Sequence, residues 1–147
     1  MIPLRDTEDV KGPVWATLAL IVANFVLHVA GEIPHMNFWQ AMVALLGLWL
    51  FGLYVERRLG SLAYLAIYLV LAGSTGFLVG AVDEPGGMFA ISLFLPVLGL
   101  GLLHLALAPK SKILVMVPVP FAMSFYEVPT VAMLVIWVAV EVLLTAV

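Results

Sequence analysis

Two histidines, one serine and one glutamate are the residues of this chain whose types and positions could support chemistry. Ser92 and His104 lie in one apolar segment, and a serine needs an adjacent base to act as a nucleophile. Twelve positions separate them. On a helix this is roughly 18 Å, whereas proton transfer requires about 3 Å. The two residues therefore cannot form a catalytic dyad, and the absence of cysteine excludes disulfides, thiol catalysis and thiolate metal sites.

The histidines could instead bind a cofactor, because neutral imidazole is the commonest metal ligand. His28 and His104 are candidate axial ligands of a haem or a chlorophyll-type pigment. Their helices run in opposite directions, so His28 lies toward the outer face and His104 toward the inner face, which excludes one haem bridging both. Glu141 is either a satisfied carboxyl or part of a proton path, but a path needs several such groups in register. The sequence predicts no metal site and no cofactor, with a pigment or haem on a histidine as the alternative.

The composition determines the class of protein that must position these residues. Hydrophobic residues make up 65% of the 147 positions and charged residues 10%. Ordinary soluble domains are roughly half apolar and a quarter charged. A bilayer core of about 30 Å needs about 20 apolar residues per helix. Five segments meet this requirement, and we expect all five to span the membrane: 14–30, 38–55, 62–82, 88–108 and 128–147.

Charges, glycines and prolines separate these segments, because hydrocarbon excludes charge and prolines end helices. One further stretch, Ile113–Phe121, is apolar but is interrupted by Pro118 and Pro120. We expect it to lie at the membrane interface and not to span. Acidic residues precede the first segment, so it is interpreted as a mature helix and not as a signal peptide.

Successive connecting segments lie on alternate sides of the membrane, so each charged residue can be assigned to one side. Glu32, Asp83 and Glu84 fall on one side, without a lysine or arginine. The positive-inside rule then predicts a cytoplasmic N-terminus and an outside C-terminus, as in a multi-pass protein of a bacterial inner membrane. The net charge of −3 indicates no nucleic-acid partner. All six basic residues fall on the opposite, cytoplasmic side: Arg5, Lys11, Arg57, Arg58, Lys110 and Lys112.

Several motifs resemble one family. The run Leu48-Trp49-Leu50-Phe51-Gly52, followed by Val55-Glu56-Arg57-Arg58-Leu59-Gly60, is similar to the "LWxFGxxVExRxG" pattern of the rhomboid intramembrane serine proteases. Met1–Asp6, Pro109–Ile113, Val117-Pro118 and Glu127–Pro129 with Trp137 agree in order and spacing, so the resemblance covers essentially the whole chain. It implies an all-α, rhomboid-like bundle of five transmembrane helices in a single domain, 1–147. The structural motif residues are Trp49, Phe51, Gly52, Glu56, Arg58 and Gly60.

The resemblance also shows which catalytic features are missing. An active rhomboid carries its serine in a "GxSG" context at the head of the fourth helix, where this chain has Met88 and Phe89. Counting back from the proline after that helix places Phe94 there instead. The family also uses two residues of the second helix to stabilise the oxyanion that develops during proteolysis. Here these positions correspond to Gln40 and Ala44, and only the glutamine side chain can donate a hydrogen bond.

Two further features of an active rhomboid are not expected. The sixth helix and its histidine are expected to be absent, because the chain stops at Val147, at the end of the fifth segment. His28 could match the depth of Ser92, but it lacks the "GxSG" elbow.

The leading hypothesis is therefore a pseudoprotease that binds transmembrane helices of other membrane subunits as a scaffold. Alternatives are a pigment- or quinone-associated subunit of a photosynthetic or respiratory complex, and a residual intramembrane serine protease. Small residues let helices approach closely, which makes them candidate contacts with a partner helix. These glycines are Gly73, Gly76, Gly80, Gly99 and Gly101.

Overall fold

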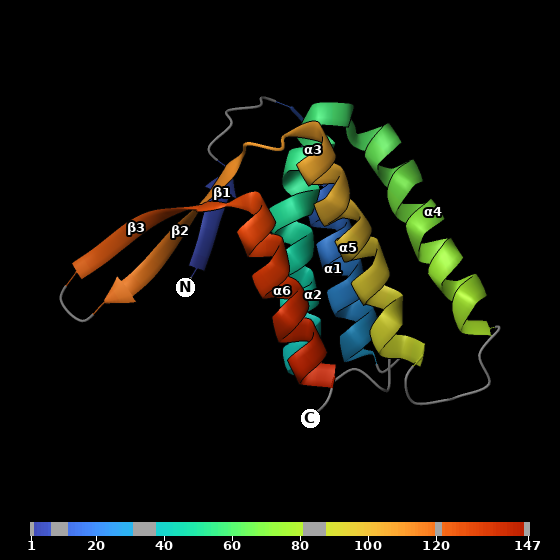
Figure 1. The fold of residues 1–147 in the computed structure, drawn as a ribbon. Coiled ribbons are helices and arrows are strands. Elements are labelled where there is room, and N and C mark those ends of the chain that lie inside the picture. The colour runs from blue at the N-terminus through green and yellow to red at the C-terminus, as the bar shows by residue number, and fades with distance from the viewer. Residues whose placement is uncertain (1, 7–11, 31–37, 81–87, 120–121, 146–147) are drawn as a thin grey trace.

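Five helical segments form the bundle of the computed structural model (Figure 1). The structure describes residues 2–6, 12–30, 38–80, 88–119 and 122–145, with side-chain surroundings for 12–30, 38–74, 95–115 and 125–144. The predicted bundle of five helices is confirmed. The helices are α1 (Trp15–Val29), α2 (Phe38–Gly47), which continues through the π-helical η1 (Leu48–Gly52) into α3 (Leu53–Leu59), α4 (Ser61–Gly80), α5 (Met88–Leu107) and α6 (Thr130–Thr145).

One of these segments stands out by length. Among the residues whose side-chain surroundings are described, Phe38–Leu59 is the one helix that is long enough, at 22 residues, and apolar enough to cross a membrane. Within the same residues, the other apolar helical stretches are shorter: Trp15–Val29, Ser61–Ser74, Leu95–Leu107 and Thr130–Leu144.

The long helix ends at Gly60, where the chain turns into α4. Gly60 has a φ of 87°, a conformation that side chains of L-residues rarely adopt. Its N–H donates to the carbonyl of Glu56 across 2.7 Å, and its carbonyl accepts from Tyr64 across 3.0 Å. The turn is therefore hydrogen-bonded on both sides and requires glycine.

A three-stranded antiparallel sheet accompanies the helices, in the order β1-β2-β3. Its strands are β1 (Ile2–Asp6), β2 (Lys112–Val119) and β3 (Ala122–Pro129). β2 and β3 form a hairpin in which Lys112 pairs with Pro129 and Val119 with Ala122. The sheet was not predicted. The short apolar stretch that was expected at an interface is largely strand β2, because its backbone groups find partners on both neighbouring strands.

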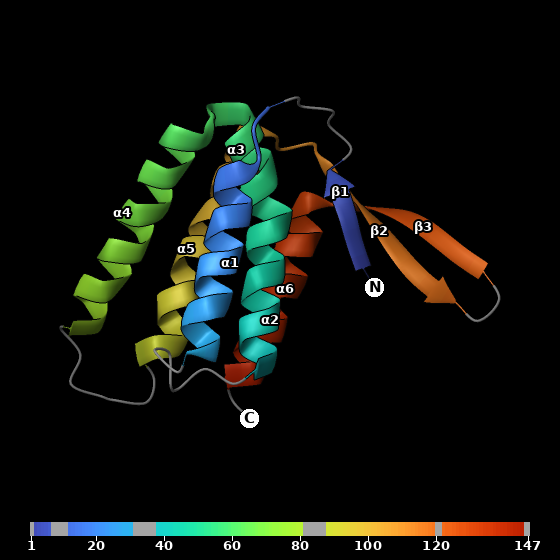
Figure 2. The same cartoon turned by 180° about the vertical axis from the view of Figure 1, so that it is seen from behind.

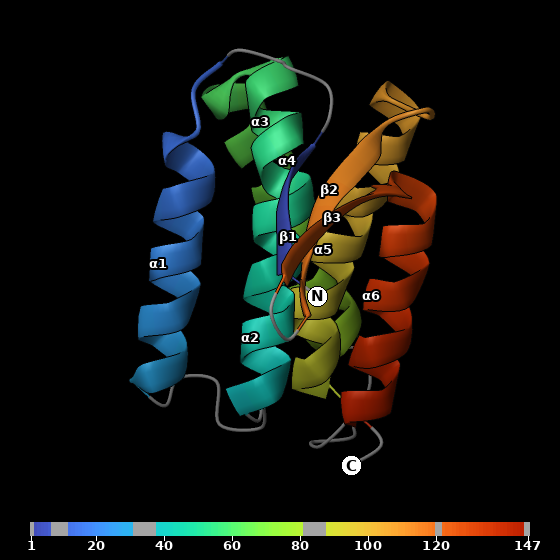
Figure 3. The same cartoon turned by 90° about the vertical axis from the view of Figure 1, so that its left-hand side faces the viewer.

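The views agree on how sheet and bundle are arranged. α5 packs against α4, η1, α6 and α2, while α1 contacts η1, α2 and α4 (Figures 1 and 2). The sheet projects sideways from the flank formed by α2 and α6, as the side view shows (Figure 3). β2 directly follows the turn after α5, and β3 leads directly into α6.

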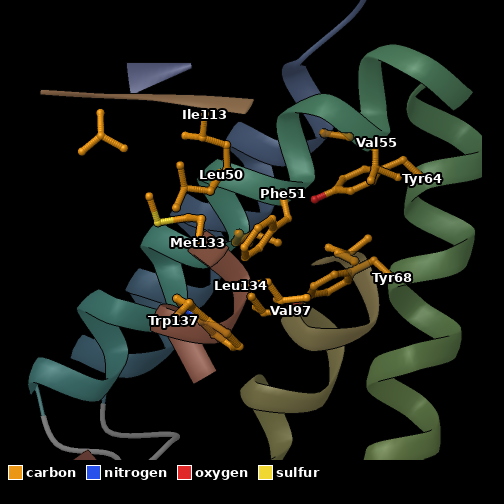
Figure 4. Close-up of a cluster of buried hydrophobic side chains, with 14 residues drawn as sticks. Leu50, Phe51, Val55, Tyr64, Tyr68, Val97, Ile113, Met133, Leu134 and Trp137 are labelled. Atoms are coloured by element: carbon orange, nitrogen blue, oxygen red, sulfur yellow. The ribbon is translucent and has the colours of Figure 1, made fainter. Parts of the chain in front are cut away.

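The core lies where the long helix meets α4, α5 and α6 (Figure 4). Phe51 and Val55 are fully buried, and Tyr64, Val97 and Trp137 close around them. Ile113 and Val115 of β2 belong to the same cluster, which explains why the base of the hairpin is held against the bundle.

The outside of the bundle is also apolar. Leu62 on α4, Val22 on α1 and Val135 on α6 are 80%, 61% and 65% exposed. A soluble protein rarely exposes a contiguous apolar surface of this kind on every helix. Lipid chains can cover such a surface without cost, so the exterior is suited to a bilayer.

Candidate functional site

The described polar side chains gather at the basic end of the bundle. Here α1 and α6 begin and α3 and α5 end, and Arg57, Arg58 and Lys110 lie at this end (Figure 1). Two buried polar clusters lie just inside it. One is centred on Glu56 and the other on Ser111.

Glu56 is fully buried and joins three helices. Its Oε1 accepts from the backbone N–H of Ala16 across 2.9 Å, and its Oε2 accepts from that of Thr17 across 2.8 Å. Ser61 donates its hydroxyl to Oε1 across 2.5 Å. The first N–H groups of a helix lack intrahelical partners and favour negative charge, and α1 has no side-chain cap of its own at Val14. Glu56 of α3 therefore caps α1 and holds the start of α4.

Gly52, one turn before Glu56, lets the same three helices approach. A Cβ at this position would lie 2.6 Å from the hydroxyl of Tyr64 and 3.2 Å from Cγ2 of Thr17. Real Cβ contacts are not that short. The glycine of the motif is therefore a packing requirement, with α1 and α4 both resting on its backbone.

The second cluster fastens the end of α5 to the start of α6. Nε2 of His104 lies 3.1 Å from Oγ of Ser111, which lies 2.7 Å from Oγ1 of Thr130. The hydroxyl of Thr130 donates to the carbonyl of Ser111 across 3.1 Å. The backbone N–H of Thr130 donates to the same carbonyl at the same distance.

The Ser111–Thr130 and Ser111–His104 contacts can each run in either direction. If Thr130 donates to the carbonyl, its single proton is used, so Ser111 donates to Thr130 and His104 donates to Ser111. If Thr130 donates to Ser111, the serine can donate to the imidazole, which is the polarity that a general base needs. In both arrangements His104 and Ser111 are buried, at 0% and 4% exposure, so the contact lies inside the bundle.

His104 is also unsuited to bind a pigment. Its ring is fully buried and stacks on Tyr54 at 4.1 Å with an interplanar angle of 11°, while Phe51 meets its edge at 6.1 Å. Its Nε2 is engaged by Ser111. A pigment or haem on His104, the alternative that the sequence left open, would have to displace the core of the bundle.

His28 lies toward the opposite end, on α1. It is half-buried, and its Nδ1 has no hydrogen-bond partner among the side chains that the structure describes. One helical turn before it, Asn24 donates to the hydroxyl of Tyr68 on α4 across 3.1 Å. His28 therefore lies in line with a polar contact between α1 and α4, away from His104.

The positions that correspond to the oxyanion site lie on α2. Gln40 and Ala44 are buried, at 5% and 2% exposure. Between them in the sequence, the carbonyl of Val43 accepts the indole N–H of Trp137 from α6 across 2.9 Å. Glu141, one turn after Trp137, is also buried on α6. Met88 and Phe89 begin α5, but their side chains, like those of Ser92 and Phe94, fall outside the described surroundings.

The candidate glycines differ in what they face. A Cβ on Gly99 would lie 2.8 Å from Leu71 of α4, and one on Gly101 would lie 2.5 Å from Leu134 of α6. These two glycines accommodate helices of their own chain. Gly73 has nothing within 4 Å of its Cβ position. Gly76 and Gly80 lie beyond the described side-chain surroundings.

Sequence reasoning did not identify several polar residues that the fold uses. Thr17, Ser61, Ser111 and Thr130 are buried and lie in or beside the two clusters. The only local signals were that Ser61 follows the glycine turn and that Thr130 follows a proline before an apolar run.

Comparison with known proteins gives one match. The family model of the Rhomboid domain matches residues 14–147. No curated protein and no solved structure matches the chain significantly.

Proposed function

Because the chain belongs to the rhomboid family, whose members are proteins of the lipid bilayer, we propose that it is a non-catalytic member that binds transmembrane helices. In this proposal all five helices span a bacterial inner membrane, with the basic end in the cytoplasm. The protein then acts as a scaffold subunit within a larger membrane assembly.

The observation that carries the non-catalytic role is the burial of the Ser111–His104 contact. Among the hydrogen bonds described, this is where a serine meets a histidine, and both side chains are buried, at 4% and 0% exposure. Ala44, at the second oxyanion position, is 2% exposed and carries no donor. Together with Met88 at the nucleophile position, these features support a loss of protease chemistry.

The outward face of α4 supports binding of a helix. Leu62, Ala66, Leu69 and Gly73 are exposed and share one face at helical spacing. Gly73 leaves open space where other residues would place a side chain. Between membrane helices, association depends on packing, and small residues allow close approach. This face is therefore suited to a partner helix.

Affinity purification in mild detergent followed by native mass measurement tests the scaffold role. We expect a membrane protein to co-purify with the native chain. The variant Gly73→Leu should lose this partner, because the added side chain fills the open space. Val135→Leu is the matched control, since Val135 is 65% exposed on a different helix, and it should retain the partner. A monodisperse monomer without any companion would contradict the proposal.

A serine-directed fluorophosphonate probe tests the loss of catalysis. We expect no covalent labelling of the native chain in proteoliposomes. Ser92→Ala and Ser111→Ala identify the labelled residue if labelling occurs. Labelling that disappears in either variant would establish a reactive serine and overturn the non-catalytic assignment.

A further inference from the structure

The β2–β3 hairpin extends sideways from the bundle and stays between the levels of the two helix ends (Figures 1 and 2). Eight paired positions, from Lys112 with Pro129 to Val119 with Ala122, make it about 26 Å long at about 3.3 Å per residue. It leaves the flank of the bundle sideways and slopes back alongside the helices (Figures 1 and 2). A hairpin that extended into water would continue beyond the helix ends.

The described part of β3 exposes an aromatic side chain on each face of the hairpin. Paired residues of an antiparallel sheet point to the same face. Val115 is fully buried against the bundle, yet its partner Tyr126 is 55% exposed. Phe125, on the other face, is 56% exposed. A sheet with one face in water would carry polar residues there, whereas aromatic side chains on both faces are typical of the membrane interface.

The backbone sets a limit on how deep the hairpin can lie. β3 is at an edge of the described sheet, so its outward N–H and C=O groups need partners. Hydrocarbon offers none, and open sheet edges do not occur there. The headgroup layer contains water and polar groups that can satisfy such an edge.

Basic residues lie at the base of the hairpin and on the same end of the bundle. Lys112 is paired with Glu127 across 3.0 Å, which neutralises both. Lys110 and Arg58 are exposed, and Arg57, next to Arg58 in the sequence, is half-buried. The carboxylate of Glu56 at this end is fully buried, so the exposed charge of the described side chains is positive and complementary to anionic lipid headgroups.

We infer that the β2–β3 hairpin is an interfacial membrane anchor that lies in the headgroup layer and prefers anionic lipid. Phe125 and Tyr126 rest at the boundary with the acyl chains. Lys110 and Arg58 contact phosphate. This surface differs from the outward face of α4, and it requires no partner helix.

The absence of cysteine allows a direct measurement of depth. A single cysteine introduced by Phe125→Cys or Tyr126→Cys carries a nitroxide without competing sites. The label is measured in nanodiscs of phosphatidylcholine, with or without phosphatidylglycerol. Its accessibility to oxygen, which is enriched in lipid, is compared with that to a water-soluble nickel chelate.

Two reference values calibrate the scale. A free water-soluble nitroxide gives the value for water and should be accessible to nickel, whereas Val135→Cys marks the exposed side of α6 and should be accessible to oxygen. We expect the labels at 125 and 126 to lie between these two values and to move deeper when phosphatidylglycerol is present. In the chain labelled at 125, the double variant Lys110→Gln/Arg58→Gln should remove the shift to greater depth. The single variant Lys110→Gln should reduce it.

Four outcomes would overturn the inference. Nickel accessibility at 125 equal to that of the free nitroxide would place the hairpin in water. Dipolar broadening between two labels at 125 would show that a second copy covers the β3 edge. A depth that ignores phosphatidylglycerol, or a shift that persists without both basic residues, would exclude recognition of anionic lipid.

Discussion

The indole N–H of Trp137 donates to the carbonyl oxygen of Val43 across 2.9 Å, and this bond joins α6 to α2. The indole lies so close to α2 that only glycine fits beneath it. A Cβ on Gly47 would lie 2.5 Å from Nε1 of Trp137 and 2.6 Å from Cγ1 of Val97. One aromatic side chain and one glycine thus determine how closely two helices approach.

Removing this donor should loosen the contact between α2 and α6. Trp137→Phe keeps an aromatic ring but loses the N–H, and we expect a loss of about 1–2 kcal/mol in the free energy of unfolding. Unfolding in a titration with sodium dodecyl sulfate, followed by circular dichroism, measures it. Gly47→Ala should cost about 1–3 kcal/mol through overpacking. That cost should shrink in a Trp137→Leu background, and additive costs would contradict the assigned contact.

The carboxylate of Glu56 should be replaceable neither by alanine nor by an amide. Glu56→Gln places an NH2 group against N–H and O–H groups that donate to the carboxylate. We expect the free energy of unfolding to fall by about 3 kcal/mol, close to the effect of Glu56→Ala. Ser61→Ala removes only one donor and should cost about 1 kcal/mol. Amide hydrogen exchange supplies a local measurement, because Ala16 and Thr17 should exchange faster in both Glu56 variants. Unchanged exchange at these two amides would refute the cap.

The Ser111 hydroxyl should matter for stability and not for reactivity. Ser111→Ala removes the hydroxyl that Nε2 of His104 and the hydroxyl of Thr130 both contact in a buried site. We expect a loss of about 2 kcal/mol. Ser74→Ala is the matched control, because Ser74 donates to the carbonyl of Leu71 at an exposed position, and its cost should stay within about 0.5 kcal/mol. Equal effects of the two substitutions would argue against the buried chain of bonds.

Two glycines should respond in opposite ways to the same methyl group. Gly52→Ala drives a Cβ against the hydroxyl of Tyr64, and we expect a loss of about 1–3 kcal/mol. Gly73→Ala meets open space and should be neutral, or stabilising by up to about 1 kcal/mol through helix propensity. Thermal unfolding in detergent compares them. Tyr64→Phe should rescue part of the loss caused by Gly52→Ala, and the absence of any rescue would place the clash elsewhere.

The long helix shows how much of the fold could be predicted. The predicted segment 38–55 begins where the helix begins, because length and composition indicate whether a segment suits a bilayer, but the helix continues through the charged residues to Leu59. The hairpin could not be placed in this way. Ile113–Phe121 is apolar, short and rich in proline, and its strand structure depends on pairing with β1, more than 100 residues earlier in the sequence.

The candidate site was predictable in part. Residue type alone shows that Ala44 cannot donate and that Met88 cannot act as a nucleophile. The interpretation of His104 required the fold, because a histidine in an apolar segment has the same sequence signal as a ligand and as a buried hydrogen-bonding group. Ser111, which decides between them, lies in a different element of the chain.

By itself, the sequence determined that this protein is built of apolar helices, and that its positive charge lies at one end. Through its resemblance to one family, it also predicted that residues needed for protease chemistry are replaced. These properties follow from residue type and order. The tertiary structure decided which polar groups meet, such as Glu56 with the start of α1, and which glycines face inward. The physical reason is that these helices are apolar on all sides, so the sequence does not specify how each is rotated about its axis, and only packing against neighbours does.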